Sequence, residues 1–131
     1  MAAEFELQKA LFAAVSGLGY LTYDAAPQAE DGGAASAFPY VEIGAIVPAM
    51  FDTKEVNGFD AVARIHTYSR SAGMRQCKDI QGAIYARLHN GALIVAGQNT
   101  ILIQRETSFC SRIDDNAFHG VCEYRVLIEA V

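Results

Sequence analysis

Apolar residues recur every three or four positions near the start of the chain and predict an amphipathic helix over Glu4–Ser16. The apolar stripe consists of Leu7, Ala10, Leu11, Ala14, Val15 and Leu18. Phe5 and Phe12 lie partly off this stripe. They therefore either widen the buried face of the helix or contact another subunit.

A second stripe with the same spacing predicts another helix in the middle of the chain. It consists of Met74, Cys77, Ile80, Ile84 and Leu88, while the residues expected to face away are Arg75, Lys78, Asp79 and Gln81. Ser69 or Ser71 is a suitable N-cap. Asn90 and Gly91 predict the end of the helix, because these residues tolerate the backbone conformation that terminates helices.

Alternating or β-branched stretches predict four strands. They cover Phe38–Val47, Val56–Ser69, Thr100–Phe109 and Phe118–Ala130, and Pro48 is expected to end the first. In the second strand the residues expected on one face are Phe59, Ala61, Ala63 and Ile65, and those expected on the other are Asp60, Arg64 and His66. This alternation is typical of a sheet with one face in water.

The segments between these elements read as connections. Tyr20–Ala25 is a short extended piece, and residues 28–37 contain no large apolar side chain, which predicts a mobile loop. Asp114, Asp115 and Asn116 indicate a turn over Ile113–Ala117. The element order α-β-β-α-β-β predicts a single α+β domain in which two helices pack on one face of an antiparallel sheet of about four strands.

Composition narrows the class of protein. A chain of 131 residues fits one domain, and 52% hydrophobic with 19% charged residues is globular rather than disordered composition. A net charge of −5 opposes general affinity for nucleic acid. No apolar run approaches the roughly 20 residues of a membrane span, and the first residues lack the basic start of a secretory signal. The three cysteines, Cys77, Cys110 and Cys122, are typical of a reduced protein that uses them as small core residues.

No set of residues in the sequence predicts a catalytic, cofactor or metal site. His119 and Cys122 are spaced like a ligand pair, but three positions along a strand places them on opposite faces. Gly-x-Ser-x-Gly is absent, and Asp31-Gly32-Gly33 lacks the lysine of a phosphate-binding loop. Asp114 and Asp115 are expected to be solvated turn residues. We therefore expect no enzyme activity and no cofactor.

Two groups of residues fit neither the core nor an ordinary solvated surface. Met50 and Phe51, with Asp52 and Lys54, lie in the connection after Pro48. On the polar strand face, Tyr68 accompanies Arg64 and His66. Clustered apolar and aromatic residues of this kind favour a subunit interface, although a connection that folds back onto the core would also bury the first group.

Four stretches, in this order, resemble one protein family. They are Tyr23–Pro27, Pro39–Gly44, His66–Arg70 and Gly120–Glu129. The chain resembles the tail-completion proteins, also called tail terminators or minor tail components, of long non-contractile-tailed phages and gene transfer agents. Tyr68 departs from the family, whose members often carry tryptophan there, but the position stays aromatic.

The resemblance implies a structural subunit of the virion, made in the cytoplasm of a bacterial host. It implies a homo-oligomeric ring, hexameric in such families, that caps the head-proximal end of the tail tube, ends its growth and joins the tail to the head. Its partners would be the tail tube protein and head-completion or connector proteins. DNA would pass through the bore without sequence-specific binding, and no membrane is involved.

Other functions remain open at this stage. A head-tail connector or neck subunit is the nearest alternative. A small dimeric ligand-binding domain would use the strand face that carries Arg64, His66 and Tyr68. For the tail function, we expect that changing Met50 and Phe51 to serine impairs ring or tail joining and leaves the monomer folded.

Overall fold

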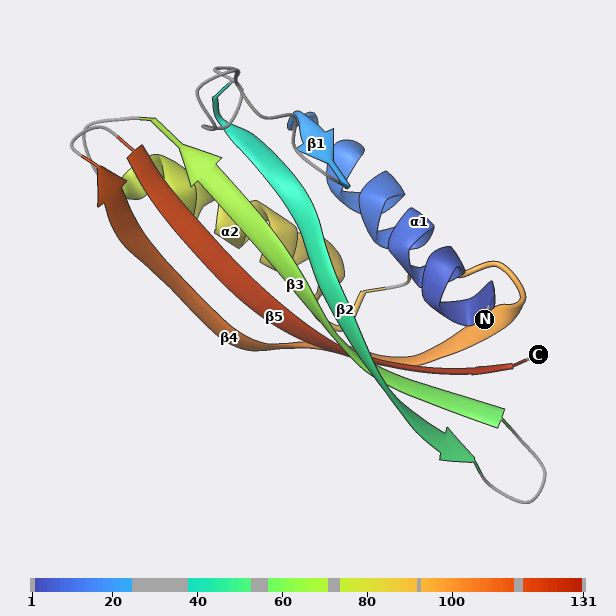
Figure 1. Cartoon of the computed structure of the whole chain (residues 1–131). Coiled ribbons are helices and arrows are strands. Elements are labelled where there is room, and N and C mark those ends of the chain that lie inside the picture. The colour runs from blue at the N-terminus through green and yellow to red at the C-terminus, as the bar shows by residue number, and fades with distance from the viewer. Residues whose placement is uncertain are drawn as a thin grey trace, which may run out of the picture.

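The protein folds as two layers, a sheet and a pair of helices that cover one of its faces (Figure 1). The computed structural model describes residues 2–24, 38–52, 57–70, 74–91, 93–114 and 117–130. Its elements are α1 (Ala2–Ser16), β1 (Thr22–Tyr23), β2 (Tyr40–Asp52), β3 (Asn57–Ser69), α2 (Arg75–Leu88), β4 (Gln98–Asp114) and β5 (Ala117–Ala130). The loop predicted over residues 28–37 lies outside the described residues. Within the described part of the chain, no helix is long and apolar enough to cross a membrane.

The sheet has five strands in the order β1-β2-β3-β5-β4, so the prediction of four antiparallel strands is wrong in two details. β1 adds a fifth strand, and it runs parallel to β2, with Thr22 opposite Val41. The amide of Val41 also donates to the carbonyl of Leu21 at 2.8 Å. A strand of two residues is too short to show an alternating pattern, which is why the sequence indicated only an extended piece.

β2 continues past Pro48, which the sequence analysis expected to end it. Pro48 lies opposite Ala61 of β3, and the pairing runs on until Asp52 lies opposite Asn57. β1 pairs with β2 only at Val41 and Glu42. Among the residues that the structure describes, the stretch of β2 around Pro48 therefore pairs with β3 alone. Proline is tolerated in such an edge strand when its nitrogen, which cannot donate, faces away from the neighbouring strand.

β4 and β5 form a longer hairpin than predicted. β4 extends past Phe109 to Asp114, so it includes part of the predicted turn over Ile113–Ala117. Asp115 and Asn116 lie outside the described residues. The extra length comes with three register irregularities, the last between Arg112 and Asp114. Bulges of this kind let a strand continue through residues that do not follow a strict alternation.

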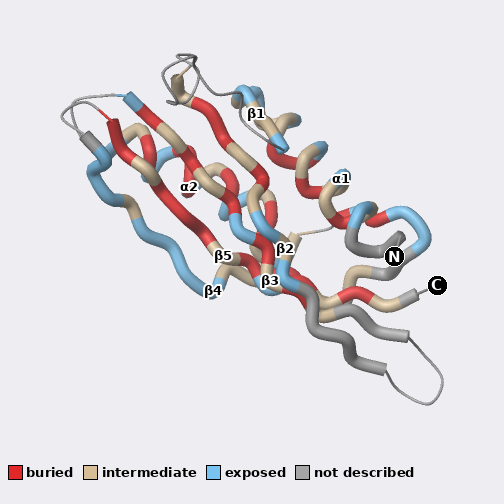
Figure 2. The backbone as a smooth tube through the Cα atoms, in the orientation of Figure 1, coloured by how far each residue is buried: buried red, intermediate tan, exposed pale blue. Residues whose placement is uncertain are grey.

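Both predicted helical stripes face the sheet and form one core with it, as the buried segments in Figure 2 show. The stripes bury Leu7, Leu11, Ala14 and Val15 of α1 and Cys77, Ile80, Ile84 and Leu88 of α2. Their partners on the sheet include Val41, Ile43, Ala61, Ala63, Ile65, Ile103, Cys122, Tyr124, Val126 and Ile128. Phe12 packs partly against this core, whereas the side chain of Phe5 is 60% exposed. Met74 precedes α2 and is also exposed.

The start of α2 differs from the prediction. Ser69 is the last residue of β3 and is buried, so it does not cap the helix. The N-cap is Met74, which makes no side-chain capping bond, and Ser71 lies outside the described residues. The N-terminal half of α2 therefore depends on its packing against the sheet rather than on a cap.

Gln81 anchors α2 to the sheet, although the helical pattern predicted that it faces away. Its side chain is only 3% exposed. The amide Nε2 donates to the carbonyl of Phe109 at 3.0 Å, and Oε1 lies 3.1 Å from the sulfur of Cys110. Space for this side chain exists because Gly120 has no Cβ; a Cβ there would collide with Gln81 and lie 2.6 Å from the sulfur of Cys77.

Candidate interaction face

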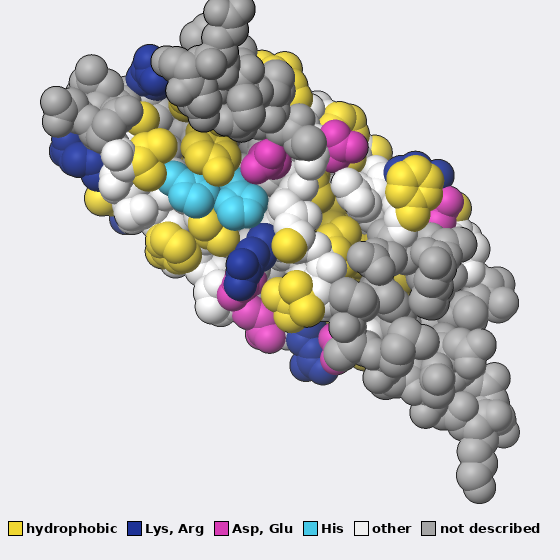
Figure 3. Space-filling model, viewed as in Figure 1, with side chains coloured by type: hydrophobic (Ala, Val, Ile, Leu, Met, Phe, Trp, Pro, Cys, Tyr) yellow, Lys and Arg dark blue, Asp and Glu magenta, His cyan; other side chains and the backbone are white. Residues whose placement is uncertain are grey.

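The face of the sheet that the helices leave uncovered carries a group of aromatic, histidine and charged side chains. We call it the open face and define it by Glu42 of β2, Arg64, His66 and Tyr68 of β3, Thr107 and Phe109 of β4, and His119, Val121 and Glu123 of β5. Figure 3 shows this side of the molecule, with the histidines next to each other and hydrophobic and charged side chains around them. The strand register brings these residues together from all four long strands.

A row of stacked rings crosses the open face. Tyr40 stacks on Tyr68 with ring centroids 4.8 Å apart, and Tyr68 stacks on His119 at 4.6 Å. His119 in turn stacks on His66 at 5.1 Å. Tyr23 also contacts the first ring edge-on, at 5.6 Å. Burial raises the pKa of Tyr40 to about 12, so its hydroxyl is neutral at physiological pH and adds no charge to the row.

The two histidines are joined by a hydrogen bond. His66 Nδ1 and His119 Nε2 are 2.8 Å apart, so one ring donates its proton and the other accepts it. Gly44 of β2 makes room for the first ring, because a Cβ at that position would lie 2.6 Å from atoms of the His66 ring. The pair is therefore packed in place by the neighbouring strand and shares one proton.

The surroundings of the pair disfavour its protonation. Burial lowers the pKa of both His66 and His119 below the ordinary histidine value. Glu42 faces both rings and opposes this effect, whereas the positive charge of Arg64 lowers the pKa of His66 further. A charge on His66 would also repel a charge on His119, which lowers the pKa of His119 further.

The lowered pKa values predict a loss of stability in acid. As the pH falls below about 6.5, the unfolded chain takes up protons on these histidines more readily than the folded chain does. The free energy of unfolding therefore falls over the range between the unfolded and the lower folded pKa values. We expect urea denaturation to show a larger loss from about pH 7 to about pH 5 for the wild type than for the double variant His66→Gln/His119→Gln. Equal losses of unfolding free energy in the two proteins would contradict the lowered pKa values of His66 and His119.

Two ion pairs lie on the same side of the sheet. Arg64 Nε is 2.8 Å from Glu123 Oε2, and Arg125 forms two hydrogen bonds with Asp60, at 2.9 and 3.2 Å. Thr107 also donates to Glu123 at 3.0 Å. These groups are partly or fully exposed to solvent, and exposed ion pairs of this kind add little to stability. Their main effect is to hold the charged side chains in fixed positions on the face.

The centre of the open face is slightly hollow. A shallow cavity of about 310 Å³ is lined by Arg64, His66, Phe109, Val121 and Glu123. The side chain of Phe109 is 54% exposed at its border. Aromatic residues and arginine are enriched at protein-protein interfaces, so the exposed ring of Phe109 near Arg64 suits such a surface.

Only three of the predicted interface residues can be placed on the open face. Arg64, His66 and Tyr68 lie together on the open face. Met50, Phe51 and Asp52 belong to β2 rather than to a connection, and their side chains lie outside what the structure describes. Lys54 lies outside the described residues as well. The connection after Pro48 was thus placed wrongly, because the sequence gives no sign that Pro48 sits at an edge.

The sequence did not identify the other residues of the open face, among them His119 and Phe109, or Tyr40 at the end of the stacked row. His119 lies opposite Tyr68 and diagonal to His66, while Tyr40 and Phe109 complete the row and the cavity border. The sequence did predict that His119 and Cys122 lie on opposite faces of β5. What it could not show is that β5 lies between β3 and β4, because this order depends on contacts between distant parts of the chain.

The expected separation of His119 and Cys122 is confirmed. His119 lies on the open face, whereas Cys122 is buried among the residues that face the helices. Among the described residues, no group of three or more His, Cys, Asp and Glu side chains is placed to hold a metal ion. The open face therefore offers stacking, hydrogen bonding and charge pairing to a partner surface.

Comparison with known proteins identifies one family and one solved structure that are similar to this chain. The family described as "Tail completion protein gp17" matches residues 7–129. A chain from the solved structure titled "Virion of native gene transfer agent (GTA) particle" has a TM-score of 0.83 and 19% sequence identity, with 99% of each chain covered. At this identity the likeness shows the fold alone. A search of curated proteins found no significant match. The family match spans nearly the whole sequence, so this chain belongs to the tail completion protein family and is a structural component of a phage-like tail that serves in virion assembly.

Proposed function

We propose that this protein forms a hexameric ring at the head-proximal end of a phage-like tail tube. The ring stops growth of the tube and joins the tail to the head. Its partners are further copies of the same chain, the tail tube protein and the head-completion or connector proteins. The observation that carries the proposal is the family match over residues 7–129.

The open face supports subunit contacts of this kind. It presents the stacked row that ends in His66, the ion pair between Arg64 and Glu123, and the exposed ring of Phe109. An interface built from these groups combines apolar burial with directional charge pairs. Such a combination fixes the rotation between neighbouring subunits, which a closed ring requires.

The two edges of the sheet offer a second kind of contact. β4 is one outer strand of the five-strand order, and at the other edge β1 covers only Val41 and Glu42 of β2. Unpaired strand edges bind other strands readily. Because the two edges differ, pairing β4 of one copy with β2 of the next would be a head-to-tail contact, which generates rings when the rotation closes.

The charge of the chain fits the passage of DNA. Each subunit carries a net charge of −5, so a ring of several copies is strongly acidic. In this proposal an acidic bore repels the phosphates of DNA and leaves no binding sites that would slow its passage. A cryo-EM reconstruction that showed a basic lumen would contradict this part of the proposal.

Removal of the protein tests the proposed position in the particle. Particles assembled without it should carry overlong tails or tails that lack heads, because neither tube growth nor joining is controlled. Electron micrographs of mutant and wild-type lysates would measure tail length and the fraction of joined particles. Unchanged tails that are fully joined to heads would refute the proposal.

Solution size tests the ring itself. Size-exclusion chromatography with light scattering should give a hexamer, or a monomer that assembles only when tail tubes are added. A stable dimer that carries a bound metabolite would instead favour the ligand-binding alternative, for which the shallow cavity beside His66 is a candidate site.

A further inference from the structure

A pair of cysteines lies at the contact between α2 and β4, away from the open face. The sulfur atoms of Cys77 and Cys110 are 3.1 Å apart, and both residues are reduced thiols in this structure. A disulfide bond has a sulfur-sulfur distance of about 2.05 Å, so the two atoms need to approach each other by about 1 Å. They are 33 positions apart in the sequence, so the sequence alone gave no reason to pair them.

The two thiols differ in their access to solvent. Cys77 is fully buried, and burial raises the pKa of its thiol well above the ordinary value. Cys110 is partly exposed and forms part of the wall of a surface cavity of about 540 Å³ between α2 and β4. A reagent that enters this cavity reaches Cys110 first and finds Cys77 directly behind it.

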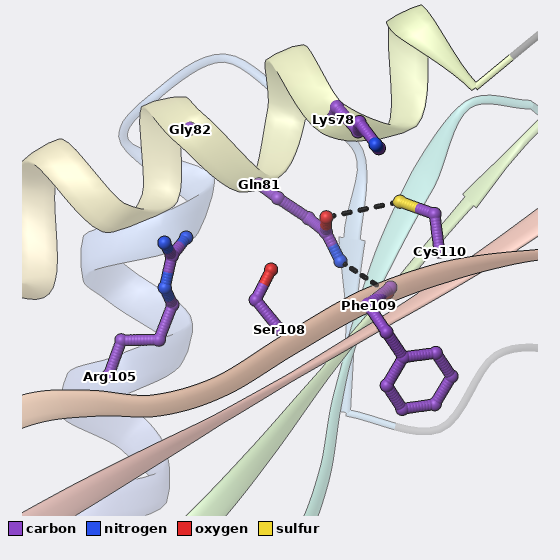
Figure 4. A pocket seen from close by; sticks show the side chains of 7 residues that line it. All are labelled: Lys78, Gln81, Gly82, Arg105, Ser108, Phe109 and Cys110. Carbon is purple, nitrogen blue, oxygen red and sulfur yellow. Dashed lines mark hydrogen bonds between the residues drawn. The ribbon is translucent and has the colours of Figure 1, made fainter.

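The cavity has the charge and shape to admit a small anionic molecule. Figure 4 shows Lys78 and Arg105 at its border and Cys110 directed toward Gln81, while the ring of Phe109 points away to the other side of β4. The described residues that line it include these two cations and no acidic side chain. The two positive charges attract anionic reagents into the cavity.

We propose that Cys77 and Cys110 form a regulatory disulfide that links α2 to β4 when the protein meets an oxidising environment. The oxidant is a small anionic disulfide such as oxidised glutathione. Cys110 loses its proton to water, and its sulfur attacks one sulfur of the oxidant. The disulfide bond of the oxidant breaks, a mixed disulfide forms at Cys110, and one glutathione thiolate leaves. Cys77 then loses its proton to water and attacks the sulfur of Cys110, which releases the second glutathione. Two protein thiols are oxidised to one disulfide, and one glutathione disulfide is reduced to two thiols.

A virion passes from a reducing to an oxidising environment, which is the change that this reaction requires. The chain is made in a reducing cytoplasm, where the pair stays as two thiols, and a released particle is exposed to an oxidising medium. The bond would close a loop of roughly thirty residues and fix a helix to an outer strand of the sheet. The particle would thus become more stable after release than during assembly. The inference rests on the cysteine geometry and is independent of the proposed ring.

The test uses the purified full chain, incubated with oxidised glutathione under native conditions. Thiol titration after denaturation should fall from three thiols to one. Mass spectrometry of the unreduced digest should find Cys77 linked to Cys110 and Cys122 free. The oxidised protein should melt about 10 °C higher than the reduced one. Three remaining thiols, or a link that includes Cys122, would overturn the proposal.

Single variants test the order of the steps. Cys77→Ser should retain a glutathione adduct on Cys110, because the second thiol is missing. Cys110→Ser should carry no adduct on the buried Cys77. Cys122→Ser is the matched control, since it removes another buried cysteine, and it should form the Cys77–Cys110 bond normally. An adduct on Cys77 in the Cys110→Ser variant would contradict the assigned order of attack.

Discussion

Replacing Gly120 with valine should lower the free energy of unfolding by about 3 kcal/mol, a large share of the stability of a small domain. A Cβ at Gly120 would lie 2.6 Å from the sulfur of Cys77 and would collide with the amide of Gln81. The valine therefore displaces the buried side chain of Gln81, which then loses its hydrogen bond to the carbonyl of Phe109. Urea denaturation followed by circular dichroism measures the change.

Gly82 provides the matched control for this variant. It lies in α2, one position after Gln81, and no atom lies within 4 Å of the Cβ that an alanine would add. Gly82→Ala should therefore stabilise the protein by about 0.5–1 kcal/mol, because alanine favours the helical conformation more than glycine does. If Gly120→Val were as stable as the wild type, the close contact between α2 and β5 at this position would be refuted.

Replacing Phe109 with glutamate should strongly weaken the proposed subunit assembly and leave the monomer folded. The ring of Phe109 is more than half exposed on the open face, so the substitution should change the free energy of unfolding by less than about 0.5 kcal/mol. In the proposed ring the same position would be buried beside Glu123, where an added carboxylate would be neither hydrated nor paired. We expect subunit association to weaken by about 100-fold or more, as measured by light scattering.

Ile94 supplies a control with the same change in charge. It is the most exposed of the large hydrophobic residues described, at 88%, and it borders a cavity on the helical side together with Ala10, Ala13 and Arg87. Ile94→Glu should assemble like the wild type. If Phe109→Glu assembles normally while Ile94→Glu does not, the subunit interface lies on the helical side and our choice of the open face is wrong.

The helices and strands of this protein were largely predictable from the sequence. The spacing of Leu7, Leu11 and Val15 predicted α1 and its buried face, and the alternation along Phe118–Ala130 predicted β5. These predictions succeed because helices and strands repeat over a few residues, so a single face leaves a regular pattern in the chain. The family resemblance, confirmed by the match over residues 7–129, used the same local stretches in their order.

Features that depend on a neighbouring strand or helix were predicted poorly. Pro48 was expected to end β2, and only the sheet order shows that a proline is tolerated there. Gln81 was expected to face solvent, but Gly120 on another strand gives it a buried site. In both cases the deciding residue lies far away in the sequence.

The same distinction between local pattern and tertiary contact applies to the candidate site. The sequence by itself determined that Arg64, His66 and Tyr68 share one strand face, since alternate residues of a strand point to the same side. Only the tertiary structure decided that β5 lies beside β3, which places His119 against His66, and that α2 crosses β4 where Cys77 meets Cys110. The physical reason is that strand order and helix docking follow from the burial of apolar surface by the whole chain, which leaves no repeating pattern in any one segment.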